Sequence, residues 1–283
     1  MSADRRAPRR PASTLRAAAA GHVPRKRFGQ HFLADRAVLA AIVAAIDPQP
    51  ADRMIEIGPG PGALTGPLLE RLDQLTAIEI DRDLCARLRR RWPPERLTLI
   101  EGDALRVPFD ELVSAEPAAP RARLVGNLPY NISSPLLVRL LEFRQRISDQ
   151  HFLLQDEVVD RIVAVPGTAQ FGRLGVLLQA FYQVDKVLEV PPEAFDPPPR
   201  VDSALLRMRV LAQPLAGSAQ ALQQVLAVAF GQRRKMLRGT LLPWLRERGV
   251  DAGSIDGERR AEDLSVATYC ALANSLRSIS SIL

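Results

Sequence analysis

Four consecutive residues, Asn127 to Tyr130, suit one chemical task. The exocyclic amino group of a nucleobase is a poor nucleophile, and two hydrogen-bond acceptors on it would draw its nitrogen toward tetrahedral geometry. The Asn127 amide oxygen offers one acceptor, and the Leu128 carbonyl offers a second because the following proline disfavours the helical region for Leu128. Tyr130 adds an aromatic face for an unstacked base. A polar turn that ends a strand is the alternative reading.

A second aromatic candidate is Phe195. It lies in the stretch 190–200, which contains five prolines and should therefore form a stiff loop. A rigid loop with one aromatic side chain predicts that Phe195 forms the second face of a base sandwich opposite Tyr130. The alternative is that Phe195 packs in the core.

A glycine-rich turn at Gly58 follows the apolar strand 53–57 and precedes a helix, as in nucleotide-binding folds. The glycines also fit a dinucleotide pattern. Pro59 and Pro61, however, remove amides that a pyrophosphate would need, and Glu56 would place a carboxylate near a ligand ammonium group. S-adenosylmethionine, which has an amino acid tail and no phosphate, therefore fits better than NAD.

Acidic residues end two further predicted strands. Glu79 lies 21 residues after Gly58 and is expected to accept both ribose hydroxyls of the ligand, while Asp103 is expected to accept its adenine amino group. Ligands of open α/β sheets bind at the carboxyl ends of the strands, where Asn127 also lies. We predict strands at 53–57, 75–81, 97–100, 123–126, 152–155, 184–190 and 203–210.

Helices are expected between these strands and after them. Asp35 should cap a helix at 36–46, and Ser134 with Pro135 should open one that ends near Phe143. Further helices are predicted at 158–163, 175–182, 216–230 and from Ser265 to Leu276. Alternating strands and helices with an antiparallel return indicate an α/β fold.

Composition limits the other possibilities. The 283 residues are 47% hydrophobic, and no apolar run approaches the length of a membrane span. The spacing of Cys85, Cys270 and three histidines predicts neither a disulfide nor a metal site. Positive charge is concentrated in residues 1–27, which carry eight Lys or Arg against one acid. Residues 1–24 lack apolar periodicity, so we expect a disordered basic extension that contacts RNA, with an organelle transit peptide as the alternative.

Two further groups of cations are candidates for RNA contact. Arg25, Lys26 and Arg27 precede two phenylalanines, and a solvated entry segment is the alternative there. The second group comprises Arg233, Arg234, Lys235 and Arg238. We expect it to lie on a helix with Met236 and Leu237 facing inward, and a solvated helix face is the alternative.

Many segments together resemble the KsgA/RsmA family of small-subunit ribosomal RNA adenine dimethyltransferases, which is related to the Erm and mitochondrial transcription-factor-B groups. They cover roughly residues 25–274 and read RKRFGQHFL, EIGPGPGALT, AIEID, GDAL, NLPYNISSPLL, LLQDEVVDRIVA, FGRLGVLLQ, VPPEAFDPPPRVDSALLR, QRRKMLRGTL and RAEDLSV. The basic leader is not part of the family pattern.

The resemblance implies a fold and an activity. The expected fold is a class I S-adenosylmethionine-dependent methyltransferase, with a Rossmann-like seven-stranded sheet over 25–210 and a small all-α domain over 211–283. The expected reaction dimethylates N6 of two adjacent adenosines in the 3′-terminal hairpin of small-subunit (16S) rRNA within an immature subunit. We expect a cytoplasmic monomer without metal. The implied cofactor positions are His31, Leu33, Gly58, Glu79, Asp103 and Asn127.

Three alternatives share parts of this pattern. An Erm-type enzyme would act on large-subunit RNA, and a non-catalytic assembly or transcription factor would bind RNA on the same scaffold. An NAD enzyme would share only the glycine-rich turn. We interpret His31 as a residue that shapes the backbone rather than as a proton carrier.

Overall fold

The computed structural model describes residues 31–113, 116 and 120–280. Most of its strands contain β-branched or leucine residues and are buried, which suits a sheet covered on both faces. The strands are β1 (Phe32–Leu33), β2 (Met54–Ile57), β3 (Leu75–Glu79), β4 (Leu97–Glu101), β5 (Ala122–Asn127), β6 (Ile147–Gln155), β7 (Tyr182–Val190), β8 (Phe195–Asp196) and β9 (Ser203–Val210).

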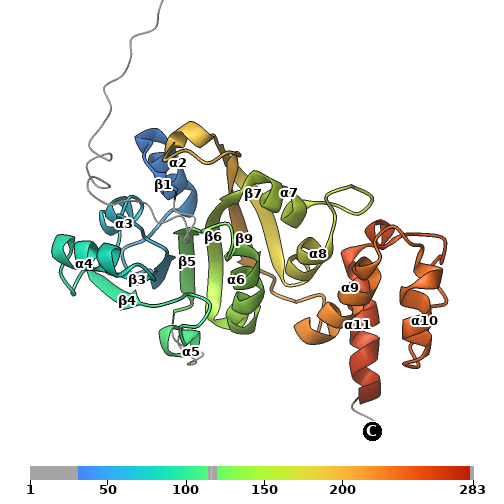
Figure 1. Cartoon of the computed structure of the whole chain (residues 1–283). Helices are drawn as coiled ribbons and strands as arrows, with labels where there is room; N and C mark the ends of the chain where they lie inside the picture. The colour runs from blue at the N-terminus through green and yellow to red at the C-terminus, as the bar shows by residue number, and fades with distance from the viewer. Residues whose placement is uncertain (1–30, 114–115, 117–119, 281–283) are drawn as a thin grey trace, which may run out of the picture.

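Seven strands form one sheet in the order β4-β3-β2-β5-β6-β9-β7 (Figure 1). Strands β2 to β6 pair in parallel, and β9 runs antiparallel to its neighbours β6 and β7. This is the Rossmann-like sheet of class I methyltransferases, so the predicted fold class is confirmed. The carboxyl ends of β2, β3, β4 and β5 therefore meet at one edge, and β1 and β8 form a separate antiparallel pair.

Helices connect the strands and form the C-terminal part. They are α2 (Arg36–Ile46), α3 (Thr65–Leu69), α4 (Arg82–Arg91), α5 (Phe109–Leu112), α6 (Ser133–Leu140), α7 (Asp156–Val163), α8 (Arg173–Gln179), α9 (Ala219–Gly231), α10 (Leu241–Arg246) and α11 (Val266–Ser280), with 3-10 turns η2 (Leu141–Arg146), η3 (Pro192–Ala194), η4 (Leu237–Gly239) and η5 (Ala261–Asp263). Two of the three predicted caps are present, since Asp35 accepts from the first turn of α2 and Ser265 from the Thr268 amide.

Some predicted local structure was wrong. Arg233, Arg234 and Lys235 do not lie on a helix, because α9 ends at Gly231 and a turn with an exposed Met236 follows, while Arg238 lies in the short 3-10 element η4. Ser134 does not cap α6, whose N-cap is Ile132. The helix expected at 175–182 ends at Gln179, because the buried Tyr182 already belongs to β7.

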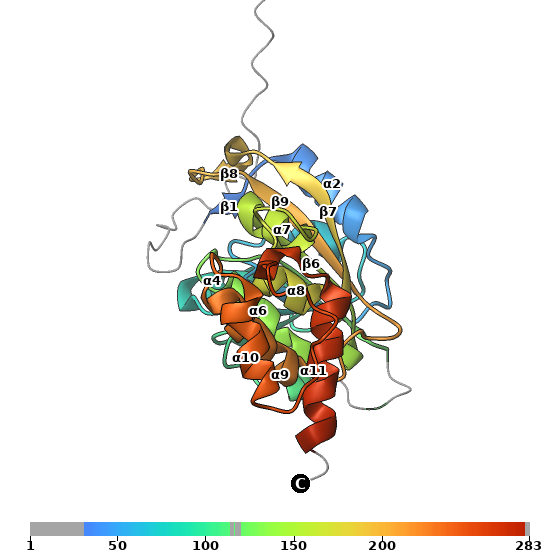
Figure 2. The same cartoon turned by 90° about the vertical axis from the view of Figure 1, so that its right-hand side faces the viewer.

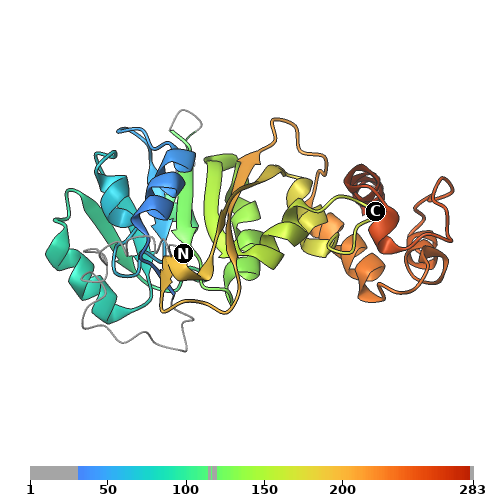
Figure 3. The same ribbon diagram turned by 90° about the horizontal axis from the view of Figure 1, so that it is seen from above.

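The main hydrophobic cluster continues from the sheet into the C-terminal helices. It contains Ile55 of β2, Phe181, Leu226 of α9 and Tyr269 of α11, all at most 3% exposed. Figures 1 and 3 show α9, α10 and α11 at the end of the molecule away from α4, and Figure 2 shows these helices side by side. The limits 25–210 and 211–283 remain a prediction.

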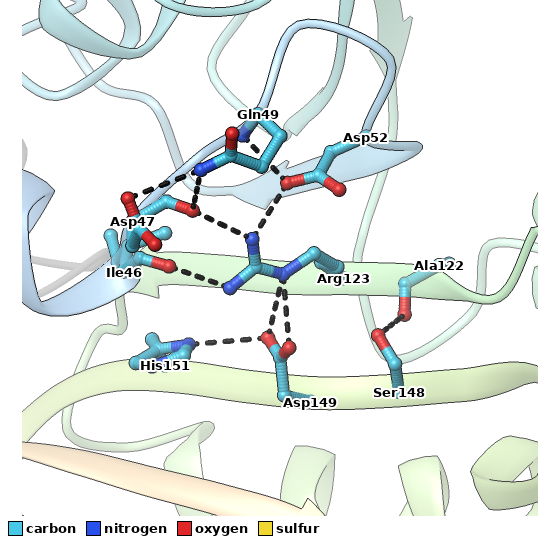
Figure 4. A network of polar contacts seen from close by, with 9 residues as sticks. All are labelled: Ile46, Asp47, Gln49, Asp52, Ala122, Arg123, Ser148, Asp149 and His151. Atoms are coloured by element: carbon cyan, nitrogen blue, oxygen red, sulfur yellow. Dashed lines mark hydrogen bonds and ion pairs between the residues drawn. The ribbon is translucent and has the colours of Figure 1, made fainter.

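A polar network joins α2 to the amino ends of β5 and β6 (Figure 4). The Arg123 guanidinium binds the Asp52 carboxylate at 2.6 Å and the Asp149 carboxylate at 2.9 Å, and it donates to the Ile46 carbonyl at the end of α2. Burial opposes ionisation of Asp149, but His151 and Arg123 outweigh it and hold the pKa of that carboxyl below its usual value. The network lies at the sheet edge opposite the carboxyl ends of the strands.

Two further observations concern the described part of the chain. No helix in it is long and apolar enough to cross a membrane. Both Cys85 and Cys270 are buried and unpaired, and no cluster of three or more His, Cys, Asp or Glu side chains among these residues could hold a metal ion.

Candidate active site

A cavity of about 310 Å³ lies at the carboxyl ends of β2 to β5. Its wall contains the carboxylates of Glu79 and Asp103, and no lysine or arginine among the described residues lines it. The cavity is lined by His31, Phe32, Ile57, Gly58, Gly60, Ile78, Glu79, Ile80, Gly102, Asp103, Ala104, Asn127, Leu128, Pro129, Tyr130, Asn131 and Ile132. Glu79 has no ion-pair partner among the described residues, and Asp103 pairs only with the exposed Arg106 at 3.7 Å, so the wall favours a positively charged ligand.

The three glycine amides of the turn at residues 58–62 all have partners within the protein. The Gly58 amide donates to the Ile78 carbonyl, the Gly60 amide to Glu79 and the Gly62 amide to the Pro59 carbonyl. Gly58 adopts a φ of 69°, in the left-handed region that favours glycine. Because Pro59 and Pro61 carry no N–H, residues 58–62 offer a pyrophosphate no unoccupied amide, which argues against a dinucleotide.

Glu79 is held at the centre of the cavity wall. One carboxylate oxygen accepts from the Gly60 amide at 3.0 Å and the other from the Asp81 amide at 2.9 Å. Each oxygen keeps a further lone pair, so the carboxylate can still accept two hydroxyl groups. Burial raises the pKa of this carboxyl, and the two amide bonds oppose that shift.

Asp103 lies on the neighbouring loop after β4. Its Oδ1 accepts from the Leu105 amide at 2.9 Å, which orients the side chain at the cavity wall. Its Oδ2 lies 3.7 Å from the Nε of the exposed Arg106, beyond hydrogen-bond distance, so this oxygen can still accept from an amino group.

Asn127 is oriented by a backbone carbonyl. Its Nδ2 donates to the His31 carbonyl at 2.8 Å, and since a carbonyl can only accept, the Asn127 Oδ1 must point away from it. Among the described residues, no donor bonds to the Asn127 Oδ1 or to the Leu128 carbonyl. The Leu128 amide donates to the Leu153 carbonyl. Two free acceptors therefore follow one another at the end of β5.

The backbone beside Asn127 also requires a glycine. A Cβ on Gly126 would lie 2.3 Å from the Ile57 carbonyl oxygen, far inside van der Waals contact. The end of β5 can therefore approach β2 closely, which brings Asn127 next to the glycine-rich turn.

Tyr130 is positioned by two neighbours. Its hydroxyl lies 3.2 Å from the Ser203 hydroxyl, and its ring stacks on His31 with centroids 5.9 Å apart. The His31 Nδ1 in turn donates to the Pro197 carbonyl at 2.9 Å. His31 therefore links the segment 127–130 to the proline-rich loop through its backbone and its ring, in line with a shaping role.

Two predicted site residues lie outside the cavity. Phe195 is 4% exposed and Leu33 is 5% exposed, and the two pair across β8 and β1 within the second hydrophobic cluster. The expected base sandwich of Phe195 and Tyr130 therefore does not match this structure, because the loop turns the phenyl ring inward. Leu33 can reach a ligand only through its backbone.

The variant Phe195→Leu tests this placement. A volume-conserving change in a core is expected to lower the free energy of unfolding by about 1 kcal/mol, and methylation by less than about threefold. Urea unfolding and a methylation assay on the folded variant measure the two effects. Unchanged stability with a large loss of methylation would restore the stacking role.

Glu56 also lies outside the cavity, contrary to its expected place near a ligand ammonium group. It is 1% exposed and accepts from the Thr65 hydroxyl at 2.6 Å. Burial raises the pKa of this carboxyl from 4.5 to about 8. Its side chain therefore ties β2 to α3 instead of reading a ligand.

The raised pKa of Glu56 predicts a pH dependence. Between pH 4.5 and about 8 the folded protein keeps a proton that the unfolded chain releases, so stability should fall as pH rises through this window. Glu56→Gln keeps an acceptor for Thr65 and cannot titrate, so its unfolding free energy should vary less with pH. Urea unfolding at pH 5, 6, 7 and 8 compares the two proteins, and parallel curves would contradict the prediction.

The candidate RNA-contacting cations divide into three groups. Arg25, Lys26 and Arg27 lie outside the described residues, as does the basic extension 1–24. Arg234 and Lys235 are exposed, and no ion pair of the described residues includes them. Arg233 and Arg238, in contrast, pair with Glu262 and Glu258.

Sequence reasoning missed several cavity residues. Ile80 is 44% exposed although it is apolar, and it lines the cavity beside Glu79. An isoleucine directly after a strand-end acid was a usable signal for a surface that a flat ring could cover. Ser203, which positions the Tyr130 hydroxyl, had no local signal because it lies 73 residues away in the chain.

The sheet order and the acidic cavity at the strand ends, with no lysine or arginine among its described lining residues, define a class I methyltransferase of the S-adenosylmethionine-dependent type. The model of the family described as ribosomal RNA adenine dimethylase matches residues 21–278. The chain belongs to this family.

Individual relatives agree with this assignment. The chain is 56% identical to "Ribosomal RNA small subunit methyltransferase A" of Leptothrix cholodnii, over 90% of this chain and 93% of that one, and 56% identical to the protein of the same name of Variovorax paradoxus, over 90% and 98%. A solved dimethyladenosine transferase from Plasmodium falciparum shares the fold with a TM-score of 0.74 at 24% identity, over 88% and 98% of the chains. The 23S rRNA methyltransferase ErmE has a TM-score of 0.63 at 26% identity, over 87% and 99%.

Proposed function

We propose that this protein dimethylates N6 of two adjacent adenosines in the 3′-terminal hairpin of small-subunit (16S) rRNA, with S-adenosylmethionine as methyl donor. The observation that carries the proposal is the pair of free acceptors, Asn127 Oδ1 and the Leu128 carbonyl, beside an acidic cavity with no lysine or arginine among its described lining residues. The names of the relatives, at 56% identity, support the same substrate.

The site would bind two ligands, and one group of residues would hold the cofactor. Glu79 would hold the ribose hydroxyls, Asp103 the adenine amino group, and Gly58 would allow close backbone approach. S-adenosylmethionine supplies an electrophilic methyl group when bound. The absence of cations from the wall suits its positive charge.

Asn127 and Leu128 would act on the target base. Two acceptors on the N6 hydrogens favour a tetrahedral nitrogen, which forms only as the reaction proceeds, so their bonds strengthen in the transition state. Tyr130 would offer its ring to a base that has left its stack. Most of the acceleration should then come from proximity and orientation. Asn127 is not a base, and the released proton can leave to solvent.

Two other functions fit parts of the molecule less well. An Erm-type activity on large-subunit RNA would use the same acceptors, but identity to ErmE is 26% against 56% for the small-subunit relatives. A non-catalytic RNA-binding factor would have no use for the free acceptors at Asn127 and Leu128. We therefore favour the small-subunit enzyme.

The deciding experiment measures both the product and its position. The protein is incubated with labelled S-adenosylmethionine and immature small subunits from a strain that lacks the modification, and the label is mapped. Label on N6 of two adjacent adenosines in the 3′-terminal hairpin supports the proposal. Label on large-subunit RNA alone would support the Erm-type activity, and no label on either would support a binding factor.

The substitution Glu79→Ala tests the cofactor assignment. We expect S-adenosylmethionine binding to weaken by roughly 2 to 3 kcal/mol, because charge-assisted hydrogen bonds to two hydroxyls are lost. Titration calorimetry measures the affinity. The control is Glu101→Ala, which removes a neighbouring carboxylate at the end of β4 outside the cavity and should leave the affinity unchanged.

The compartment, the oligomeric state and the RNA contacts of the protein also belong to the proposal. We infer that the protein acts as a cytoplasmic monomer on an immature small subunit. Arg234 and Lys235 would contact RNA phosphates from the C-terminal domain, and Arg25, Lys26 and Arg27 would do so from the N-terminal side. The absence of a metal requirement follows from a reaction that needs only acceptors and orientation.

A further inference from the structure

Two segments meet where the C-terminal domain contacts the sheet domain. One is the basic turn, residues 232–236 after α9, and the other is the connecting segment, residues 164–172 between α7 and α8. The basic turn is held on its far side, because the Leu237 amide donates to the Arg259 carbonyl at 2.8 Å. That stretch of chain continues directly into η5, which contains Glu262.

Arg233 joins these parts through three bonds. Its Nε binds a Glu262 carboxylate oxygen at 2.7 Å, and its Nη2 donates to the carbonyls of Ala169 at 2.6 Å and Phe171 at 3.1 Å. A separate backbone bond runs from the Gly167 amide to the Glu262 carbonyl at 2.8 Å. Arg233 therefore bonds to the protein through its Nε and Nη2, across the contact between the two domains.

The cations in the basic turn and next to it differ in whether an acidic side chain compensates their charge. Glu262 compensates Arg233, and Glu258 compensates Arg238. Arg234 and Lys235 are exposed and have no ion-pair partner among the described residues. Counterion release on RNA binding depends on uncompensated charge, so Arg234 and Lys235 should account for the salt dependence.

The connecting segment leads to the active site. It follows α7, whose first residue Asp156 donates its amide to the Asp202 carbonyl next to Ser203, the partner of Tyr130. Lys186 of β7 fixes α7 at that end through Asp156, at 2.6 Å. The bonds from Arg233 to the connecting segment therefore set the position of the basic turn relative to the cavity.

We propose that Arg233 is a positioning residue that clamps the basic turn to the connecting segment, so that RNA held by Arg234 and Lys235 presents its adenosine to the cavity. The inference rests on the proposed function. It assigns Arg233 a bridging role between domains in place of the phosphate contact expected from the sequence.

The salt dependence of RNA binding separates the two roles. The probe is the immature small subunit from a strain that lacks the modification, and its Kd is measured over a series of salt concentrations. Arg234→Ala and Lys235→Ala should each flatten the slope of log Kd against log salt by about 0.7 to 0.9. Arg233→Ala should leave the slope unchanged, whereas methylation at saturating RNA should fall about 10-fold.

Two variants serve as controls. Arg90→Ala removes an exposed cation at the far end of α4 and reports the effect of losing a distant charge. Glu262→Gln breaks the clamp from its other side and should reproduce the loss of methylation, with no further loss in the double variant. If Arg233 instead contacts phosphate, Glu262→Gln should free it and tighten RNA binding.

The outcomes distinguish this inference from the proposed function. If the slope of log Kd against log salt is flatter for Arg233→Ala than for the wild type, the proposed role of Arg233 as a clamp is overturned, and the proposed function is not affected. A wild-type protein that neither binds nor methylates the RNA overturns the proposed function and the clamp together. If Arg233→Ala does not fold, the Glu262→Gln variant decides, because tighter binding overturns the clamp and unchanged binding with slower methylation supports it.

Discussion

The variant Asn127→Ala is expected to lower kcat by roughly 100-fold or more while RNA affinity changes by less than about threefold. The Oδ1 acceptor, which the His31 carbonyl orients, matters most as the nitrogen of the target adenosine becomes tetrahedral. Loss of one preorganised polar group at a reacting centre typically costs 10²- to 10³-fold in rate. Single-turnover methylation and RNA binding measure the two quantities separately.

Asn131→Ala is the matched control. Asn131 lines the same cavity and has the same side chain, but it is exposed and has no assigned contact with the amino group. It should retain most of its turnover. If the kcat of Asn127→Ala stays within threefold of the wild-type value, Asn127 has no role in the mechanism.

Arg123→Ala should cause the largest loss of stability, about 3 to 5 kcal/mol in the free energy of unfolding. The guanidinium is 15% exposed, and its removal leaves the carboxylates of Asp52 and Asp149 without their cation in a partly buried place. The carbonyl at the end of α2 loses its donor as well. Urea unfolding at pH 7 measures the difference.

Arg146→Ala provides the comparison. Its partner Asp110 is 71% exposed, so this ion pair is screened by solvent and its removal should cost at most about 1 kcal/mol. Equal losses for the two variants would show that the Arg123 network contributes no more than a surface pair. Cofactor affinity of any folded Arg123→Ala protein should be normal, since the network lies at the opposite sheet edge from the cavity.

Much of the sheet domain could be predicted from the sequence because its signals are local. Apolar runs set the strands, and acids at their ends, such as Glu79 and Asp103, fall at the cavity because parallel strands share one edge. Asn127 could be placed by the same reasoning. The family resemblance added the sheet order, which no local pattern contains.

The failures came from contacts between distant segments. The prolines around Phe195 predicted a stiff loop, but stiffness does not encode direction, and pairing with Leu33 turns the ring inward. The helix expected at 233–238 was overridden by bonds to residues 257–260. Glu56 was assigned from its place beside the turn, whereas Thr65 decides its orientation.

The hydrophobic cluster that runs from Ile55 to Tyr269 has a consequence for genetics. Because the C-terminal helices share that cluster with the sheet, a core lesion at Leu226 or Tyr269 should unfold the catalytic half as well. Such alleles would lower the amount of protein in the cell rather than the activity of each molecule. A screen for loss of rRNA modification would then recover many alleles in 211–283 that touch neither RNA nor cofactor, and measuring protein abundance would tell them from alleles of the basic turn.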